Sequence, residues 1–262
     1  MSVKILSEEC IGCQACIDSC PYGAIVMKED KAVITEDCTF CGACESSCNV
    51  SAIVVEREKT EDLQDISAYK GVWVFIEHRD GRMRNVSLEL IGEGRKLAQE
   101  LGEEVSAVLI GDNVAEMSRE IFASGADNIY LIEGSAFQHY TTDAYTIAFT
   151  HLIKKYLPSV ILLGATNDGR DLGPRVAARV KTGLTADCTS LEIGSHEDKK
   201  EGKVYENLLY QIRPAFGGNI IATIINPECR PQMATVREGV MKKEILSETY
   251  KGKLKKLDVA SI

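Results

Sequence analysis

The chain has 262 residues, 45% of them hydrophobic, and a formal net charge of −9. This length accommodates one small domain and one full-sized domain. No apolar run approaches about 18 residues, so the sequence predicts no membrane span. The first 62 residues hold 12 acidic and 5 basic side chains. Such an acidic chain does not suit nucleic acid as a partner.

Eight of the ten cysteines lie within the first fifty residues, in two copies of the spacing C-x2-C-x2-C-x3-C. The copies are Cys10, Cys13, Cys16 and Cys20, and, 28 residues later, Cys38, Cys41, Cys44 and Cys48. The flanking residues repeat at the same offset, since Ala24-Ile25-Val26 aligns with Ala52-Ile53-Val54. Each half predicts a strand, a cysteine loop, a short helical turn and a second strand. Residues 1–60 are therefore predicted to form an α+β ferredoxin-like iron-sulfur domain.

The spacing indicates two [4Fe-4S] clusters, because three thiolates on one loop reach one cubane while the fourth points away. In two-cluster ferredoxins that fourth cysteine ligates the other cluster. We assign the ligands as follows: Cys10, Cys13, Cys16 and Cys48 to the first cluster, and Cys38, Cys41, Cys44 and Cys20 to the second. Pro21 follows the fourth cysteine of the first copy, whereas Asn49 stands at that place in the second, which predicts a looser second turn.

Two other cysteine chemistries fit less well. A disulfide framework suits a small secreted domain, and no signal peptide precedes Cys10. A zinc site favours paired C-x2-C groups over four cysteines within eleven residues. We therefore expect a reducing, cytoplasmic setting. The acidic surface suits a redox partner with a basic patch, and is also typical of a merely solvated face.

After a polar linker at residues 61–70, strand and helix patterns alternate, which predicts an α/β domain with a mainly parallel sheet over residues 71–245. The expected strands are Val72–Glu77, Val105–Ile110, Ile129–Ile132 and Val160–Leu163. The expected helices are Leu88–Leu101, Val114–Ala123, Asp143–Tyr156 and Leu172–Val180. Beyond Gly183 come strand-like runs without helices, at Thr189–Ile193, Val204–Ile212, Ile220–Ile225 and Met233–Val236. These predict that the sheet finishes with antiparallel strands.

Two stretches of this domain are candidate ligand sites. The first, GATNDGRDLGPRVAARVKTGLTADC (residues 164–188), leaves a strand and enters a helix, with Arg170 and Asp171 expected to open that helix. Such a turn either holds an anion at the helix N-terminus or needs glycine and asparagine for its geometry alone. The second combines RPAFGGN (213–219) with RPQMATVR (230–237). Prolines, glycines and arginines in such loops place a guanidinium against an anionic ligand or a reduced flavin.

The remaining candidates have ordinary structural explanations. The histidines, His78, His139, His151 and His196, show no ligand spacing. Cys188 and Cys229 border strands, as small buried residues do. Gly92-Glu93-Gly94 lies within a helical pattern and is no dinucleotide fingerprint. No acid-base or nucleophile constellation is apparent, so we expect no autonomous catalytic site.

The two loop stretches resemble the alpha subunit of electron-transfer flavoproteins, and the resemblance runs in order from about Trp73 to Met241. Joined to the ferredoxin module, the chain resembles the ferredoxin-extended alpha subunits of electron-bifurcating complexes of anaerobes, including those serving caffeyl-CoA or related enoyl-CoA reductases. The resemblance implies a beta-subunit partner, FAD held mainly by that partner, an acyl-CoA dehydrogenase-like reductase, and ferredoxin and NADH as redox partners. Arg213 matches the family motif and is the candidate flavin contact.

The resemblance also implies a further C-terminal FAD domain, which these 262 residues do not contain. We expect residues 246–262 to be a weakly structured tail leading to it. Two other functions are open for the chain: a non-bifurcating electron carrier fused to its own ferredoxin, and a ferredoxin-bearing docking module.

Overall fold

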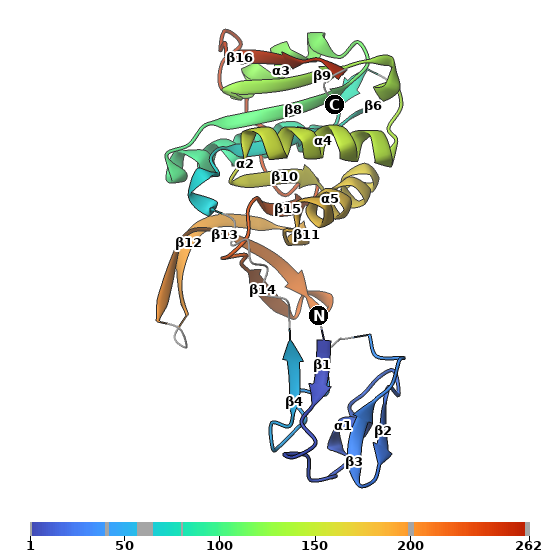
Figure 1. Cartoon of the computed structure of the whole chain (residues 1–262). Coiled ribbons are helices and arrows are strands. Elements are labelled where there is room, and N and C mark those ends of the chain that lie inside the picture. The colour runs from blue at the N-terminus through green and yellow to red at the C-terminus, as the bar shows by residue number, and fades with distance from the viewer. Residues whose placement is uncertain (1, 40–41, 57–64, 80, 199–201, 260–262) are drawn as a thin grey trace. The chain divides into compact units, whose positions relative to one another are not determined.

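The computed structural model describes residues 2–39, 42–56, 65–79, 81–198 and 202–259. The chain divides into two compact units, Met1–Asp62 and Leu63–Ile262 (Figure 1). Of the predicted linker at 61–70, the first four residues lie outside the described part. The rest contains a short 3-10 turn, η1 (Ile66–Ala68), and the N–H of Lys70 donates to the carbonyl of Leu157 at 2.8 Å. This end of the linker therefore packs with the second unit.

The first unit has the predicted ferredoxin-type arrangement. Its elements are β1 (Ser2–Ile5), α1 (Ala15–Asp18), β2 (Ile25–Lys28), β3 (Lys31–Ile34) and β4 (Ile53–Glu56). Strand β1 pairs with β4 and β2 with β3, both antiparallel. Each ladder thus joins one sequence repeat to the other. The second copy forms turns where the first has helix α1.

The second unit is built on a seven-stranded sheet in the order β11-β15-β10-β5-β8-β9-β16. Every neighbouring pair is parallel, which confirms the predicted mainly parallel α/β domain. The strands are β5 (Val72–Ile76), β8 (Val105–Gly111), β9 (Asn128–Glu133), β10 (Val160–Gly164), β11 (Leu184–Cys188), β15 (Gln232–Val236) and β16 (Lys253–Leu257). Shorter elements are β6 (His78–Arg79), β7 (Arg82–Met83), η2 (Ala115–Met117), η3 (Ser135–Phe137) and η4 (Phe216–Gly218).

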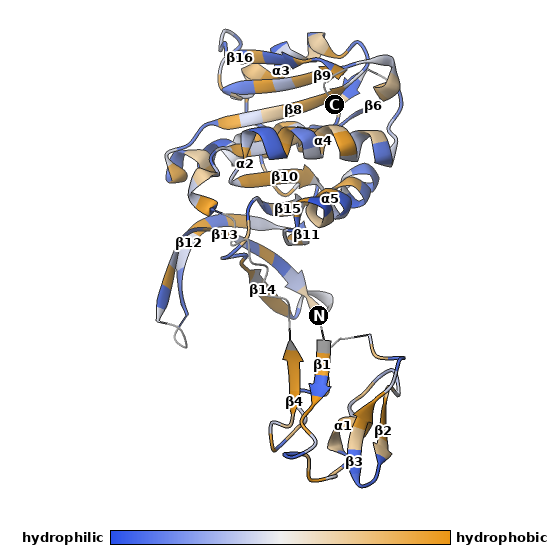
Figure 2. Ribbon diagram, in the orientation of Figure 1, coloured by the Kyte–Doolittle hydropathy of each residue, from blue (hydrophilic) through white to orange (hydrophobic). Residues whose placement is uncertain are grey.

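Helices cover both faces of this sheet, so its central strands are apolar on both sides. In β5, Val72, Val74 and Ile76 join the core under α2 (Asn85–Leu101) and α3 (Ser118–Ala123). The alternate residues Trp73 and Phe75 join the core under α4 (Thr142–Tyr156) and α5 (Asn167–Val180). Figure 2 shows the apolar character of β8 and β10 within these layers. The continuous apolar runs in the sequence are the direct result of this double burial.

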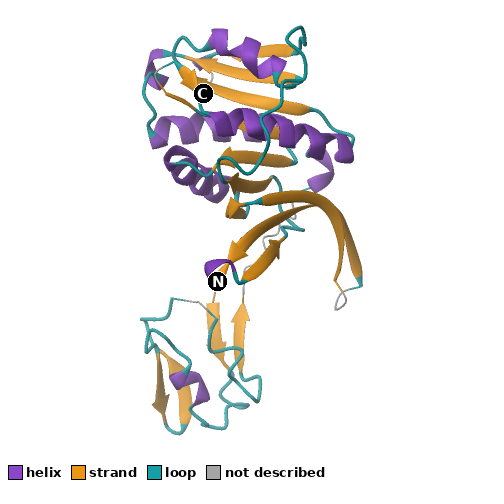
Figure 3. Cartoon of the chain, turned by 180° about the vertical axis from the view of Figure 1, so that it is seen from behind, coloured by secondary structure: helices purple, strands orange, loops and turns teal. Residues whose placement is uncertain are grey.

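The antiparallel strands differ from the prediction. Strands β12 (Ser190–Asp198), β13 (Lys203–Ala215) and β14 (Ile220–Ile224) form a three-stranded sheet of their own. The β12–β13 hairpin extends away from the parallel sheet (Figure 3). The chain then returns, and β15 inserts in parallel between β11 and β10. All five residues of β15 are buried. This explains the placement, because a strand in the middle of the main sheet is covered on both faces.

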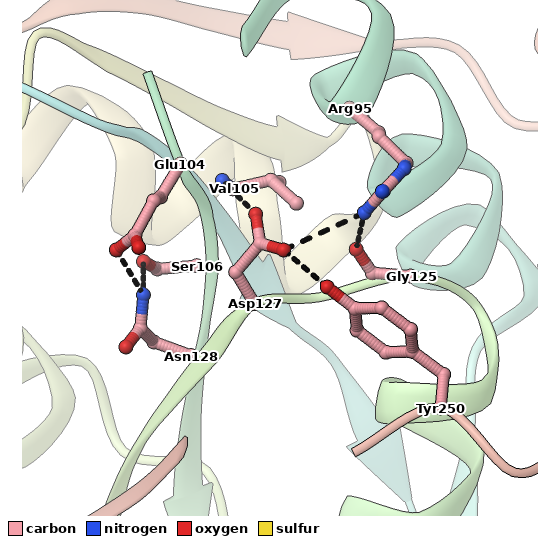
Figure 4. A network of polar contacts seen from close by, with 8 residues as sticks. All are labelled: Arg95, Glu104, Val105, Ser106, Gly125, Asp127, Asn128 and Tyr250. Atoms are coloured by element: carbon pink, nitrogen blue, oxygen red, sulfur yellow. Dashed lines mark hydrogen bonds and ion pairs between the residues drawn. The ribbon is translucent and has the colours of Figure 1, made fainter. Parts of the chain in front are cut away.

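The expectation of a weakly structured tail at 246–262 is wrong for its described residues, because β16 pairs in parallel with β9 at the sheet edge. Its lysines have partners: Lys256 pairs with Glu133 at 2.7 Å, and the Lys255 ammonium lies 4.7 Å from the centre of the Tyr130 ring. Upstream, the Tyr250 hydroxyl donates to the Asp127 carboxylate, which also accepts from the N–H of Val105 (Figure 4). These contacts fasten the tail to the α/β unit.

Candidate functional site

The cysteine side chains gather around two small cavities of the first unit. Cys10, Cys13, Cys16 and Cys48 line one cavity. Cys20, Cys38 and Cys44 line the other, and Cys41 lies outside the described residues. In each case the fourth cysteine of one motif meets cysteines of the other copy, which is the grouping that the spacing predicts. Their role as cluster ligands stays a prediction.

The loop geometry has identifiable causes. Gly12 adopts a positive φ of 70°, and a side chain at its Cα would clash with the carbonyl oxygen of Asp30. Backbone N–H groups also point at sulfur: Ala24 donates to Cys20 Sγ and Ala52 to Cys48 Sγ, both at 3.3 Å. Donors of this kind stabilise sulfur-bound negative charge and tune cluster potentials.

The thiols differ in electrostatics. Backbone N–H groups of Ala32 and Gly12 lower the pKa of Cys10, and the Lys31 ammonium lowers it further. Burial raises the pKa of Cys16. The neighbouring thiols of Cys10, Cys13 and Cys48 raise it further. Burial likewise raises the pKa of Cys44, with further contributions from neighbouring cysteines.

The donor chemistry fits iron-sulfur clusters. Iron-sulfur clusters are ligated by soft thiolate sulfur. Backbone N–H groups commonly donate hydrogen bonds to these sulfur atoms. Among the residues described, no three His, Cys, Asp or Glu side chains are placed to hold a single metal ion.

The first ligand-site candidate of the α/β unit begins differently from the prediction. Helix α5 starts at Asn167, not at Arg170, and Thr166 caps it by accepting from the N–H of Gly169 at 3.1 Å. The Thr166 hydroxyl in turn donates to Glu77 Oε2 at 2.5 Å. Glu77 is only 4% exposed, and its Oε1 has no hydrogen-bond partner among the described residues. The place that an anion would take at this helix N-terminus is occupied by the Glu77 carboxyl group.

The pKa of Glu77 is raised to about 7. Burial is the main cause, and the Thr166 hydroxyl opposes it. Two glycines leave room for the carboxyl group, since a Cβ atom at Gly164 would lie 2.6 Å from Oε1 and one at Gly169 would lie 3.0 Å from it. Glu77 is a site residue that the sequence patterns did not reveal. The available signal was an acid directly after an apolar strand, facing a glycine that ends a later strand.

The charged residues at the start of α5 are already paired. Arg170 makes two hydrogen bonds of 3.0 Å with the Asp187 carboxylate. Asp171 accepts from the hydroxyls of Tyr140 at 2.8 Å and Thr142 at 2.5 Å, and these bonds lower its pKa. Both groups therefore stabilise the fold locally.

The two arginines of the second ligand-site candidate differ: among the described residues, Arg230 is bonded within the fold, and Arg213 is not. Arg230 is buried and donates to the carbonyls of Asn226 and Cys229, at 3.1 and 3.0 Å. Arg213 lies half-buried on β13, opposite Ala222 of β14. Within the described ranges its guanidinium makes neither a hydrogen bond nor an ion pair. Arg213 is thus able to meet a group from outside the chain.

Among the other candidates, Cys188 and His78 are held within the fold, whereas Cys229, expected to be buried, is half-buried. Cys188 is fully buried, and burial raises the pKa of its thiol to about 11, which leaves it protonated and unreactive. His78 makes a 2.7 Å hydrogen bond through Nε2 with the carbonyl oxygen of Ile110. No helix of the described chain is long and apolar enough to cross a membrane.

Comparison with known proteins bears on both units. The family model of the electron transfer flavoprotein domain matches residues 72–262, and that of the 4Fe-4S dicluster domain matches residues 9–52. The electron transfer flavoprotein subunit alpha of Thermoanaerobacterium thermosaccharolyticum is 50% identical over 190 residues, which are 72% of this chain and 54% of that protein. The acryloyl-CoA reductase electron transfer subunit beta of Anaerotignum propionicum is 44% identical over 197 residues, or 70% of this chain and 54% of that protein.

A third relative matches across both units. Subunit LctC of the lactate dehydrogenase (NAD(+),ferredoxin) of Acetobacterium woodii is 37% identical over 235 residues, covering 90% of this chain and 47% of that protein. The chain thus spans about half the length of these curated relatives. The comparisons confirm the resemblance seen in the loop motifs and the cysteine spacing. The chain belongs to the electron transfer flavoprotein family and carries an N-terminal 4Fe-4S dicluster domain of the ferredoxin type.

Proposed function

We propose that this chain is the electron-transfer subunit of a flavin-based electron-bifurcating complex. It relays electrons between flavin, its own two [4Fe-4S] clusters and ferredoxin, coupled to NADH oxidation and reduction of an enoyl-CoA such as caffeyl-CoA. The proposal rests on the joining of a dicluster unit to an electron transfer flavoprotein unit in one chain. The match to subunit LctC of a lactate dehydrogenase (NAD(+),ferredoxin) extends over 90% of the chain, and so over both units.

The two units carry different kinds of candidate site, which supports this role. The two cysteine sets hold the clusters, which supply one-electron transfer when bound. The α/β unit fills its own helix N-terminus with Glu77 and leaves the Arg213 guanidinium available. FAD is then held mainly by a beta subunit and by a C-terminal domain outside these residues, with Arg213 as a contact. Cysteine thiols that must stay reduced to hold iron support a reducing, cytoplasmic location as part of this proposal.

The proposal is tested on the native complex, purified anaerobically through this chain. Two clusters predict about eight irons per chain, together with FAD, a beta subunit and an acyl-CoA dehydrogenase-like reductase. NADH is then expected to reduce ferredoxin only when an enoyl-CoA acceptor is present, because one electron of each pair must go to that acceptor. Lactate oxidation with NAD⁺ and reduced ferredoxin is the parallel assay, because the third relative is a subunit of a lactate dehydrogenase (NAD(+),ferredoxin).

Two outcomes would replace the proposal. Iron without flavin in the complex would leave a ferredoxin-bearing docking module. Ferredoxin reduction that proceeds at the same rate without an acyl-CoA acceptor would identify a non-bifurcating electron carrier.

A further inference from the structure

A lysine lies against one of the two cysteine cavities. Lys31 opens β3, and its half-buried side chain donates a hydrogen bond from Nζ to the backbone carbonyl oxygen of Cys10. Cys10 lines the first cavity, together with Ala32, the neighbour of Lys31. The loop that carries Cys10 also packs tightly on the turn before Lys31, because Gly12 has no room for a side chain beside Asp30. The ammonium group is therefore held in place next to the first cavity by the fold.

The strand position equivalent to Lys31 in the other ladder carries a neutral residue type. The two ladders of the unit correspond, since Ile25 of β2 and Ile53 of β4 are 28 residues apart, as the cysteines are. The pairings that follow are Ile25 with Ile34 and Lys28 with Lys31 in one ladder, and Ile53 with Ile5 and Glu56 with Ser2 in the other. Lys31 thus corresponds to Ser2. The strand pairing thus puts a neutral residue type opposite Glu56 where Lys31 stands opposite Lys28, although the cysteine spacing of the two copies is the same.

A fixed positive charge has a defined effect on a redox centre. Each cluster becomes more negative by one charge when it takes up an electron. A nearby ammonium group stabilises the reduced form more than the oxidised form, and net charge and hydrogen bonding are the factors that set cluster potentials. The other lysines described in this unit, Lys4 and Lys28, are exposed to solvent, which screens their charge, and the remaining charges of residues 1–62 are predominantly acidic.

We propose that Lys31 raises the reduction potential of the first cluster, held by Cys10, Cys13, Cys16 and Cys48, above that of the second. This rests on the proposed function, because it takes the two cysteine sets as cluster ligands. Electrons that enter the unit then come to rest on the first cluster. Cys13 of that cluster is exposed, so a one-electron acceptor protein reaches it at the surface.

The test is an anaerobic dithionite titration of the full chain, followed by EPR, which yields a midpoint potential for each cluster. The wild-type protein is expected to show two separate midpoints. Lys31→Gln lowers the higher midpoint, changing its oxidised-to-reduced ratio at a fixed potential by roughly tenfold, about 59 mV for a one-electron couple. The lower midpoint stays in place. Cys13→Ser, at a ligand position of the first cluster, identifies which signal belongs to that cluster.

Two variants serve as controls. Lys28→Gln removes the same charge from the paired residue of the same hairpin, but Lys28 is exposed to solvent, so both midpoints are expected to stay within a small fraction of the Lys31→Gln shift. Lys31→Arg keeps the charge and is expected to keep the wild-type midpoints, even if Lys31→Gln does not fold.

The results separate the two levels of inference. Fewer than about eight irons in the wild-type chain would overturn the cluster assignment and the proposed function with it. Eight irons with a single shared midpoint would overturn only the role of Lys31. Equal shifts in the Lys28 and Lys31 variants, or a shift of the other cluster, would do the same.

Discussion

Glu77 provides the sharpest test of how the α/β unit is built. Its carboxyl group is buried between the end of β5 and the start of α5, bonded to Thr166 through Oε2 and unpartnered at Oε1. We consider the substitution Glu77→Gln, which keeps the shape of the side chain and removes its titration. The variant leaves an amide group at the unpartnered position, which costs a constant amount of stability at every pH.

The size of the pH effect follows from the pKa. Burial raises the pKa of Glu77 from 4.5 to about 7, and each pH unit between these values corresponds to about 1.4 kcal/mol. Below pH 4.5 the group is protonated in both the folded and the unfolded chain. As the pH rises through 7, the unfolded chain loses this proton more readily than the folded one, so the wild-type protein loses about 3 kcal/mol of stability. Above pH 7 the loss is constant.

The assay is urea denaturation between pH 4 and pH 8, followed by the fluorescence of Trp73. This is the one tryptophan of the sequence, and it is buried on β5, the strand that Glu77 directly follows. The free energy of unfolding of Glu77→Gln minus that of the wild type is expected to rise by about 3 kcal/mol over this range. Other titrating groups cancel in the difference. Parallel stability curves, with a difference that stays within about 1 kcal/mol, would refute a buried carboxyl group with a raised pKa.

Two further changes test the tail and the cluster unit. Tyr250→Phe removes the hydroxyl that donates to Asp127 and is expected to lower the free energy of unfolding by about 1 kcal/mol. Backbone hydrogen exchange in β16 is expected to become faster. Unchanged exchange there would mean that the contact does not fasten the tail. Cys13→Ala removes one expected ligand of the first cluster and is expected to reduce iron from about eight to about four atoms per chain and to lower ferredoxin-coupled turnover. Binding of the beta subunit persists in this variant, and full iron content would contradict the ligand assignment.

The sequence predicts the features that depend on local spacing. The 28-residue repeat places Cys48 with the first cysteine loop and Cys20 with the second, and the two cavities have that composition. The buried strands β5, β8, β9 and β10 are likewise found from continuous apolar runs, because a parallel sheet covered on both faces leaves no polar side to alternate.

The features that sequence reasoning missed depend on distant partners. Strand β16 has the sequence Lys-Leu-Lys-Lys-Leu and is rich in lysine, as edge strands often are. Its lysines reach Glu133 and Tyr130, more than a hundred residues earlier. The burial of Glu77 depends on Thr166, 89 residues later in the chain. Neither partner is visible from the local pattern, since only the order of strands in the sheet brings them together.

The strand order also explains the structural role of Glu77 and His78, the two residues that follow β5. In open α/β sheets, ligands bind outside the carboxyl ends of strands where the order reverses. Here the order reverses between β5 and β10, with β8 on the other side of β5. Glu77 fills the space beside Gly164 at the end of β10, and His78 Nε2 lies 2.7 Å from where a Cβ atom of Gly111 would be, at the end of β8. The two side chains after β5 thus close both flanks of the position at which this fold admits a nucleotide. Under the proposed function, the cysteine unit is therefore the candidate redox centre, and half-buried Arg213 on β13 stays the candidate flavin contact of the α/β unit.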